Sequence, residues 1–222
     1  MHTKKLLFII SACGSMFFSA CSKENPATPG TNTTDEKPVT PALLCSGTTT
    51  TRHFFPLRKG NSWTTDGGSG AVTRTITKDT VIKGKTYFVL SHKNPVNGKM
   101  IESYFRSEVK GDIYEYRDYD DGNMESPYSK EYLYLPGDAD VVVGDEWKFP
   151  GAIIYQGKMN TRKITSANGS VKTSKCDYTG LVVVTEYDPE GKVAATYYFK
   201  RSLGKVRETA FGNQDLTEVV LK

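Results

Sequence analysis

The stretch from Leu181 to Thr209, LVVVTEYDPEGKVAATYYFKRSLGKVRET, decides the fold. It begins with a run of β-branched residues, passes through Asp-Pro-Glu-Gly at 188–191, and continues into an aromatic run. Proline at the second position of a turn and glycine at the fourth are typical of a type I turn. Such a turn between two runs of this composition predicts a β-hairpin.

A similar stretch lies earlier in the chain, YFVLSHKNPVNGKMIESYFRSEVKGDIYEY, from Tyr87 to Tyr116. Its turn at 94–98 has the place that 188–191 has in the later stretch, and a Tyr-Phe pair and a glycine follow in both. A glycine three residues before a tryptophan also occurs twice, at 60–63 (GNSW) and at 144–147 (GDEW). We interpret these matches as one structural unit that occurs twice.

The segments around these hairpins, such as 72–82 and 131–135, are also rich in β-branched and aromatic residues and have no helical pattern. The sequence therefore predicts an all-β domain at 53–222 with roughly ten to twelve antiparallel strands. Its repeat halves are about 53–128 and 129–222. A chain of this kind avoids exposed sheet edges by closing on itself, so we expect a curved, barrel-like meander, with a β-sandwich as the alternative.

The chain begins with MHTKKLLFIISACGSMFFSACSKEN, in which two lysines precede an uncharged apolar segment. This pattern is typical of a secretory signal and is too short for a membrane-spanning helix. Phe18-Ser19-Ala20-Cys21 resembles the lipobox of bacterial lipoproteins, which implies cleavage after residue 20 and acylation of Cys21. A second match, which ends at Cys13, leaves a shorter apolar segment, and an ordinary secreted protein is the remaining alternative.

Ser22-Lys23-Glu24-Asn25 resembles the short signal that Bacteroidota lipoproteins use to reach the cell surface. The resemblance implies an outer-membrane lipoprotein that faces either the periplasm or the outside of the cell. The rest of the segment 21–52 is rich in proline and threonine and poor in apolar residues, so it predicts a disordered spacer between the lipid anchor and the domain.

The layout of the domain resembles a group of envelope lipoproteins with an FPL..GN.W motif and a YF....G.V motif. Here these motifs are Phe55 to Trp63 and Tyr198 to Val206. The resemblance implies the fold and the location, and it brings no known activity.

Composition and charge exclude some classes of function. The chain has 29 basic and 25 acidic residues, and loss of Lys4 and Lys5 with the signal leaves a net charge of +2. A nucleic-acid-binding protein typically carries a strongly basic patch, so we expect no nucleic-acid partner. Cys45 and Cys176 remain outside the signal and the anchor, either as a disulfide or as free cysteines.

The sequence predicts neither a catalytic residue, nor a metal site, nor a cofactor. Histidines are few, and no pair of histidine and cysteine has the spacing of a zinc site. The acidic segment from Asp118 to Glu125 departs from the calcium-loop pattern by one residue, so we interpret it as a solvated loop.

Trp63 and Trp147 are the candidate ligand-binding residues, because an exposed aromatic face can stack on a sugar ring. The favoured interpretation is that both are buried anchors of the fold. We therefore expect a non-enzymatic binding or structural lipoprotein, with a small apolar or glycan ligand as the candidate partner beside the membrane. The alternatives are a lipid or lipoprotein carrier or assembly factor of the envelope and, last, a hydrolase that uses carboxylates.

Overall fold

The computed structural model describes residues 41–46, 53–68, 70–118, 129–151, 159–210 and 212–222. Nearly all of the regular structure in this part of the chain is β-strand. The elements are α1 (Pro41–Ser46), β1 (Ser62–Asp66), β2 (Val72–Ile82), β3 (Lys85–Lys93), β4 (Met100–Ser107), β5 (Ile113–Arg117), β6 (Lys130–Leu135), the 3-10 helix η1 (Asp138–Asp140), β7 (Glu146–Phe149), β8 (Asn160–Lys172), β9 (Asp177–Tyr187), β10 (Val193–Lys200), β11 (Gly204–Glu208) and β12 (Gln214–Val220).

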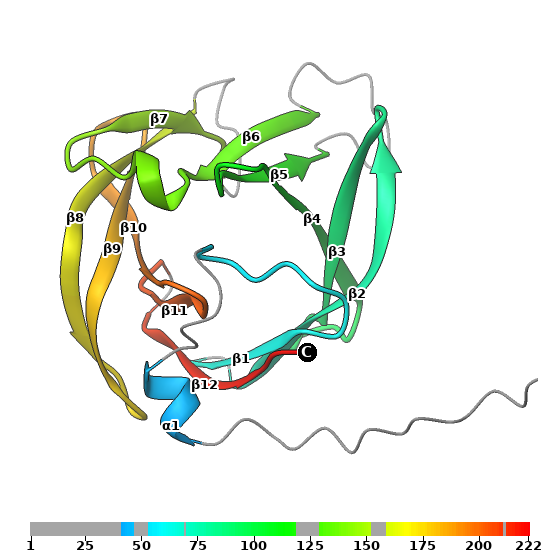
Figure 1. Cartoon of the computed structure of the whole chain (residues 1–222), viewed down its shortest axis with the longest axis horizontal. Coiled ribbons are helices and arrows are strands. Elements are labelled where there is room, and N and C mark those ends of the chain that lie inside the picture. The colour runs from blue at the N-terminus through cyan, green and yellow to red at the C-terminus, as the bar shows by residue number, and fades with distance from the viewer. Residues whose placement is uncertain (1–40, 47–52, 69, 119–128, 152–158, 211) are drawn as a thin grey trace, which may run out of the picture. The chain divides into compact units, whose positions relative to one another are not determined.

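The described strands form one antiparallel sheet of 12 strands in the order β6-β5-β4-β3-β2-β1-β12-β11-β10-β9-β8-β7. Strands that follow one another in the chain are neighbours in the sheet within each half, and the first strand pairs with the last. The sheet curves round until its edges, β6 and β7, approach each other (Figure 1). The predicted barrel-like meander is therefore confirmed. A β-sandwich needs two sheets, so that alternative is wrong.

Side-chain hydrogen bonds connect β6 to β7 and β8 at the place where, in the described part of the chain, no backbone ladder closes the barrel. Among the described residues no backbone ladder connects β6 to β7. Instead, the indole Nε1 of Trp147 on β7 donates a hydrogen bond to the Leu133 carbonyl on β6, at 2.9 Å. Arg162 on β8 donates from Nη1 to the Tyr134 carbonyl on β6, at 3.0 Å. These bonds satisfy carbonyl groups of β6 that would otherwise lack a partner strand.

Equivalent turns precede β1 and β7. The amide of Gly60 donates to the Ile76 carbonyl at 2.8 Å, and the amide of Gly144 donates to the Ile164 carbonyl at 2.8 Å. The two glycines have φ angles of 90° and 102°, a left-handed conformation that residues with a Cβ adopt only at a cost. The backbone thus has the same geometry at these two matched positions.

The segment before β1 packs into the domain with two phenylalanines. Phe54 and Phe55 are 1% and 8% exposed. The ring of Phe55 stacks on Trp63, with centroids 4.8 Å apart, and the amide of Ser202 donates to the His53 carbonyl at 2.9 Å. These contacts tie the segment to the turn between β10 and β11.

The helix α1 lies within the segment 21–52 that the sequence predicts as a disordered spacer. The prediction does not hold for these six residues, because Leu44 is only 7% exposed and packs in the main core. Disordered segments bury little apolar surface, whereas this helix buries a leucine and carries a cysteine bonded to the domain.

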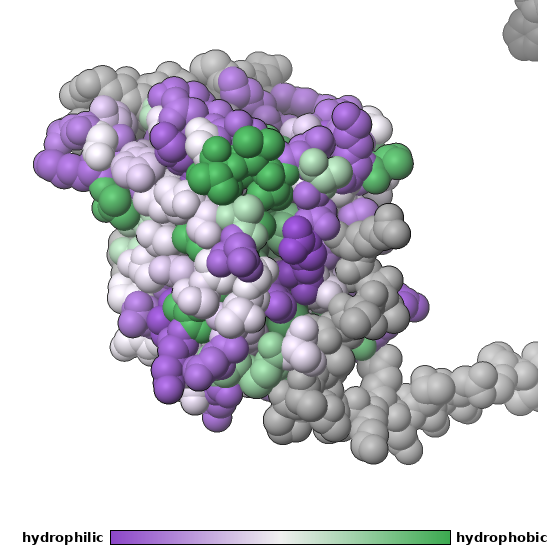
Figure 2. All heavy atoms as spheres, turned by 60° about the vertical axis from the view of Figure 1, so that its left-hand side comes forward, coloured by the Kyte–Doolittle hydropathy of each residue, from purple (hydrophilic) through white to green (hydrophobic). Residues whose placement is uncertain are grey.

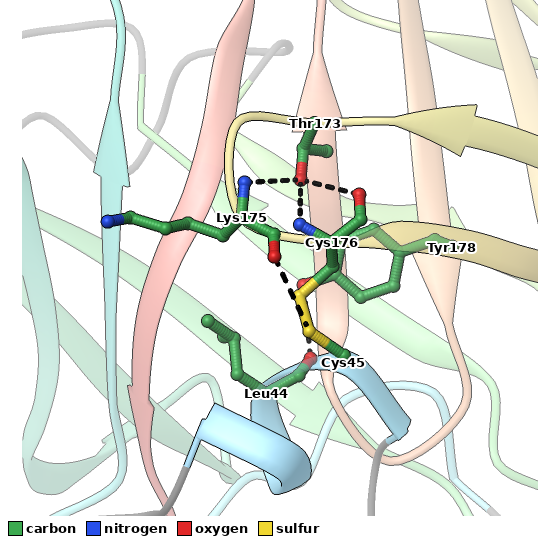
Figure 3. Close-up of a disulfide and its surroundings, with 6 residues drawn as sticks. All are labelled: Leu44, Cys45, Thr173, Lys175, Cys176 and Tyr178. Carbon is green, nitrogen blue, oxygen red and sulfur yellow. Dashed lines mark hydrogen bonds between the residues drawn. A yellow bond between two sulfur atoms is a disulfide. The ribbon is translucent and has the colours of Figure 1, made fainter.

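The cysteine pairing that the sequence leaves open is a disulfide between Cys45 and Cys176 (Figure 3). The Tyr178 hydroxyl on β9 also donates to the Leu44 carbonyl at 3.0 Å, so two kinds of bond hold α1 on the same strand pair. The Lys175 carbonyl oxygen lies 3.6 Å from Sγ of Cys45. This is a contact and not a hydrogen bond, because a disulfide sulfur has no proton to donate.

The turn that carries Cys176 is held by one threonine. The Thr173 hydroxyl donates to the Cys176 carbonyl at 2.9 Å and accepts from the Cys176 amide at 2.9 Å (Figure 3). Side-chain hydroxyl groups often replace backbone partners in this way at tight turns. The turn therefore holds the cysteine in position through contacts other than the disulfide.

Hydrophilic side chains and side chains of intermediate hydropathy cover most of the face seen in Figure 2, and hydrophobic ones gather in one compact patch and a few smaller spots. Val142 and Val143, before β7, are 56% and 57% exposed. Scattered exposed apolar residues are normal for a globular protein, so they do not by themselves indicate a docking surface.

Candidate functional site

An ion pair lies inside the barrel in the second half of the chain. Arg162 on β8 and Glu186 on β9 are directly opposite each other in the sheet, and their side chains are 3% and 6% exposed. The Arg162 Nε donates to Oε2 of Glu186 at 2.8 Å. Asn160 and Tyr197 also donate to this carboxylate, at 2.6 and 3.2 Å. A buried carboxylate needs such partners, because desolvation of an unpaired charge costs several kcal/mol.

Aromatic rings surround the guanidinium of Arg162. Its Cζ lies 3.4 Å from the ring centroid of Phe149, 4.9 Å from that of Tyr134 and 4.7 Å from that of Tyr197. A cation over an aromatic face is attracted by the ring, and the attraction increases when water is excluded. A charge pair and the rings that pack on it thus occupy part of the interior of the second half.

The first half has an equivalent arginine. The pattern Thr-Arg-x-Ile-Thr occurs at 73–77 as TRTIT and at 161–165 as TRKIT. Arg74 lies opposite Trp63 in the sheet, as the arginine of the second copy lies opposite Trp147. The ladder to the next strand also shifts register just after the isoleucine in both copies. Arg74 therefore occupies the position in the first half that Arg162 occupies in the second.

The surroundings of the two arginines differ. Three positions beside Arg74 carry smaller or uncharged side chains compared with their counterparts beside Arg162. In the matched registers, Thr65 takes the place of Phe149, and Ser103 takes the place of Tyr197. His92 takes the place of Glu186, and it lies one residue past the last pair of the ladder between β2 and β3.

A cavity of about 180 Å³ occupies this part of the barrel. Its wall combines aromatic, aliphatic and charged side chains. They are Phe55, Trp63, Thr65, Arg74, Leu90, His92, Ser103, Phe105, Glu115, Arg117, Tyr134, Arg162, Tyr197, Lys205 and Glu208. A second cavity of about 240 Å³ shares Thr65, Arg74 and His92 with the first, and a third, of about 210 Å³, adjoins it at Arg117 and Arg162. The first cavity thus shares wall residues with each of the other two, among them Arg74 and Arg162.

Positive charge is in excess on the wall of the first cavity, which has four arginine or lysine side chains and two glutamates. Arg117 pairs with Glu115 at 3.1 Å, and Lys205 pairs with Glu208. Arg74 donates to the Thr65 hydroxyl at 2.8 Å, but among the described residues no carboxylate lies within 4.0 Å of it.

The pKa values reflect this balance. Burial lowers the pKa of Arg74, and the more distant Glu208 opposes the effect only in part. Burial and the charge of Arg74 together lower the pKa of His92, so its imidazole is neutral at pH 7. Burial alone would raise the pKa of Glu208, but Lys205 and the arginines outweigh burial and lower it. Glu208 therefore stays ionised at neutral pH, and an anion entering beside Arg74 would find a cation with no carboxylate partner.

The two tryptophans that the sequence singles out as candidate ligand-binding residues differ in burial and in surroundings. Trp63 is 4% exposed, donates from Nε1 to the Leu203 carbonyl at 2.6 Å and contributes to the cavity wall. Trp147 is half-buried against the core, and it lies outside the walls of the three cavities described above. Burial of Trp63 agrees with its interpretation as a fold anchor, and of the two only Trp63 borders a space for a ligand.

Other predicted features receive little further evidence. The lipidation site Cys21 and most of the acidic segment after Asp118 lie outside the described residues. In the part of the chain that the structure describes, no group of three or more His, Cys, Asp or Glu side chains is arranged to hold a metal ion. The helices of that part are also too short or too polar to cross a membrane.

The charged residues of the barrel interior were missed from the sequence. Strand patterns predict which side chains alternate, and a charged residue in a strand is normally assigned to the solvent face. The repeated Thr-Arg-x-Ile-Thr pattern was the available signal. An arginine kept at the same place in both halves, next to a core isoleucine, indicates a structural position and not a solvated surface.

No protein-family model and no curated protein matches this chain. The fold is similar to that of a Bacteroides fragilis protein described as exported and as having a YmcC-like fold, with a TM-score of 0.44 and 11% identity over 77% of this chain and 100% of that one. It is also similar to a protein from Parabacteroides distasonis described as a lipoprotein, with a TM-score of 0.35 and 12% identity over 76% of this chain and 99% of that one. Similarities of this size assign no function to this chain.

Proposed function

We propose that this protein is a membrane-anchored envelope lipoprotein whose β-barrel domain binds a small molecule without chemical conversion. The main support is the cavity of about 180 Å³ inside the barrel, with aromatic walls and several polar groups that point to one space. Ligand sites in proteins typically combine an apolar wall with a few polar groups that orient the ligand.

The lining favours an amphipathic ligand, whereas the sequence suggests a small apolar or glycan ligand. Phe55, Trp63, Leu90 and Phe105 supply apolar surface, while Arg74 supplies a positive charge in the same wall. Drug-sized ligands occupy roughly 300–1,000 Å³, so the first cavity alone suits a smaller molecule. This size also counts against the alternative of a lipid carrier, because a diacyl lipid needs a much larger space.

The lack of an available acid supports binding over catalysis. Glycoside cleavage by two carboxylates needs one of them protonated near neutral pH, which requires a raised pKa. Glu208 has a lowered pKa and Glu115 is paired with Arg117. A glutamate with a lowered pKa, such as Glu208, is a poor proton donor, and the ion pair of Glu115 with Arg117 stabilises the wall.

The lipid anchor is inferred from the sequence around Cys21. Several acyl chains on one cysteine hold a protein on a membrane stably, since each buried CH₂ group contributes about 0.8 kcal/mol. We assign the protein to the outer membrane, with the domain facing the periplasm or the outside of the cell. The variant Cys21→Ser should leave the membrane fraction and become soluble in the periplasm or the medium. Retention of this variant in the membrane fraction would contradict the lipoprotein assignment.

Tryptophan fluorescence tests binding in the cavity directly, because the chain has only two tryptophans. Trp147→Phe leaves Trp63 in the cavity wall, and Trp63→Phe leaves Trp147 away from it. Small molecules extracted from protein purified out of its own envelope should change the emission of the first variant and not that of the second. An equal response from both variants, or protein that carries no small molecule, would count against a ligand in this cavity.

A further inference from the structure

We propose that the site beside Arg74 binds the carboxylate of the ligand, and that this carboxylate takes the place that Glu186 has beside Arg162. The inference rests on the proposed function and adds the chemical class of the ligand, a small organic acid with an apolar body.

The second half of the chain provides the internal template. There the carboxylate of Glu186 on the neighbouring strand pairs with the arginine guanidinium. Two further groups, on Asn160 and Tyr197, also donate hydrogen bonds to this carboxylate. In the first half, the ladder between β2 and β3 has the same register as the ladder between β8 and β9, and Arg74 has the position of Arg162. His92 occupies the position that the carboxylate residue Glu186 has in the second half. A buried arginine without a carboxylate partner is costly, so a site of this kind gains most from an anionic ligand.

The space for that ligand arises from two side-chain exchanges. Threonine replaces the phenylalanine that covers Arg162, and serine replaces the tyrosine that reaches Glu186. Both exchanges remove an aromatic ring, and the first cavity lies where these rings are missing. Thr65, His92 and Ser103 line it together with Arg74, so polar groups border the side of the cavity that the arginine occupies.

The geometry favours a carboxylate, because a guanidinium presents parallel N–H groups that match its two oxygens. The neutral imidazole of His92 and the hydroxyl of Ser103 can each donate a further hydrogen bond, as Asn160 and Tyr197 do to Glu186. The rings of Phe55, Trp63 and Phe105 line the same cavity and suit a small apolar or aromatic body.

The test uses the full chain in detergent with two water-soluble probes of nearly equal shape, phenylacetate and its neutral amide, phenylacetamide. Calorimetry should show that phenylacetate binds more tightly than phenylacetamide by about tenfold or more, since a charge-assisted hydrogen bond contributes roughly 1.5–3 kcal/mol. Arg74→Gln should weaken phenylacetate binding by a similar factor and leave phenylacetamide nearly unchanged.

Two further variants test whether the probe binds beside Arg74. His92→Glu places a carboxylate where Glu186 stands in the other half, so it should pair with Arg74 and abolish phenylacetate binding while the protein remains folded. Arg201→Gln is the matched control, because this arginine pairs with Asp138 and is not part of the cavity wall, and it should bind as the unchanged protein does.

The outcomes distinguish this inference from the proposed function. Equal affinity for the acid and the amide, or unchanged affinity in Arg74→Gln and His92→Glu, overturns the carboxylate site and leaves the binding function standing. Failure of both probes to bind at millimolar concentration, together with no small molecule carried by the native protein, overturns both.

Discussion

Nε of Arg162 lies 2.8 Å from Oε2 of Glu186, inside the barrel, and the two side chains are 3% and 6% exposed. Removal of one partner leaves the other charge buried and uncompensated. We therefore expect Glu186→Gln to lower the free energy of unfolding by about 3 kcal/mol, measured by denaturant titration.

The double variant Arg162→Met with Glu186→Gln tests this explanation, because it removes both charges. Its stability should lie above that of Glu186→Gln alone, since replacement of a whole buried ion pair is often nearly neutral. Arg74→Met is the matched single change at the equivalent position without a carboxylate partner, and it should cost less than Glu186→Gln. A double variant no more stable than the single one would contradict this account.

The disulfide between Cys45 and Cys176 closes a loop with a sequence separation of 131 residues. Because a crosslink of this length restricts the unfolded chain strongly, Cys176→Ser should lower the free energy of unfolding by about 2–5 kcal/mol. The double variant Cys45→Ser with Cys176→Ser should lose no more than either single change. A thiol assay on the unfolded single variant should find one additional free cysteine, and no additional thiol would show that the bridge does not form in the cell.

The order of the strands could be predicted from the sequence, because turns and alternation are local signals. Asp188-Pro189-Glu190-Gly191 forms the turn between β9 and β10, and its glycine has a φ of 83°, as in hairpins where a left-handed residue follows a type I turn. The pairing of β1 with β12 is a long-range contact that no local signal predicts, and the sequence indicated only that the chain closes on itself.

The interior of the barrel could not be predicted in the same way. A strand pattern does not say which face of a closed sheet is wet, and Arg74 and Arg162 look like ordinary surface residues. The helix at 41–46 was missed for another reason. Its stability comes from Leu44 and from a disulfide to a residue far along the chain, whereas local composition indicates a spacer.

A second ionic cluster predicts a pH dependence. Glu131 on β6 accepts hydrogen bonds from Tyr87 at 2.5 Å, from Lys85 at 2.9 Å and from Arg106 Nη2 at 2.5 Å. Burial alone would raise the pKa of Glu131, but these donors outweigh burial and lower it from 4.5 to about 2. The ionised form is therefore favoured in the folded state.

The sign follows from linkage between folding and protonation. The contribution of Glu131 to stability is present in full above pH 4.5 and is lost as the pH falls through about 2. It amounts to about 1–3 kcal/mol. An NMR titration should find the carboxyl signal of Glu131 unchanged down to pH 3, and Glu131→Gln should flatten the acid side of the stability profile. A titration midpoint near 4.5 would mean that the cluster does not hold in solution.

Gly204 at the start of β11 links backbone conformation to packing at the end of the barrel. Its φ is 88°, and a Cβ at this position would lie 2.7 Å from Cδ2 of Phe55. Gly191 has a similar φ of 83°, but nothing lies within 4 Å of the place of its Cβ. Gly191→Ala should thus cost only the backbone term of about 1–2 kcal/mol. Gly204→Ala should cost about 1–3 kcal/mol more, because the phenylalanine ring must move away from Trp63.

A double-mutant cycle separates these two costs. Phe55→Ala removes the ring that meets the new methyl group, so Gly204→Ala should cost less in that background than in the unchanged protein. In the Phe55→Ala background, Gly191→Ala should keep its full cost, since its position is open. Additive effects of Phe55→Ala and Gly204→Ala would contradict the contact between the segment before β1 and the turn at β11. That contact positions Trp63 in the cavity wall, so Gly204→Ala should also shift the emission of Trp63 in a Trp147→Phe background.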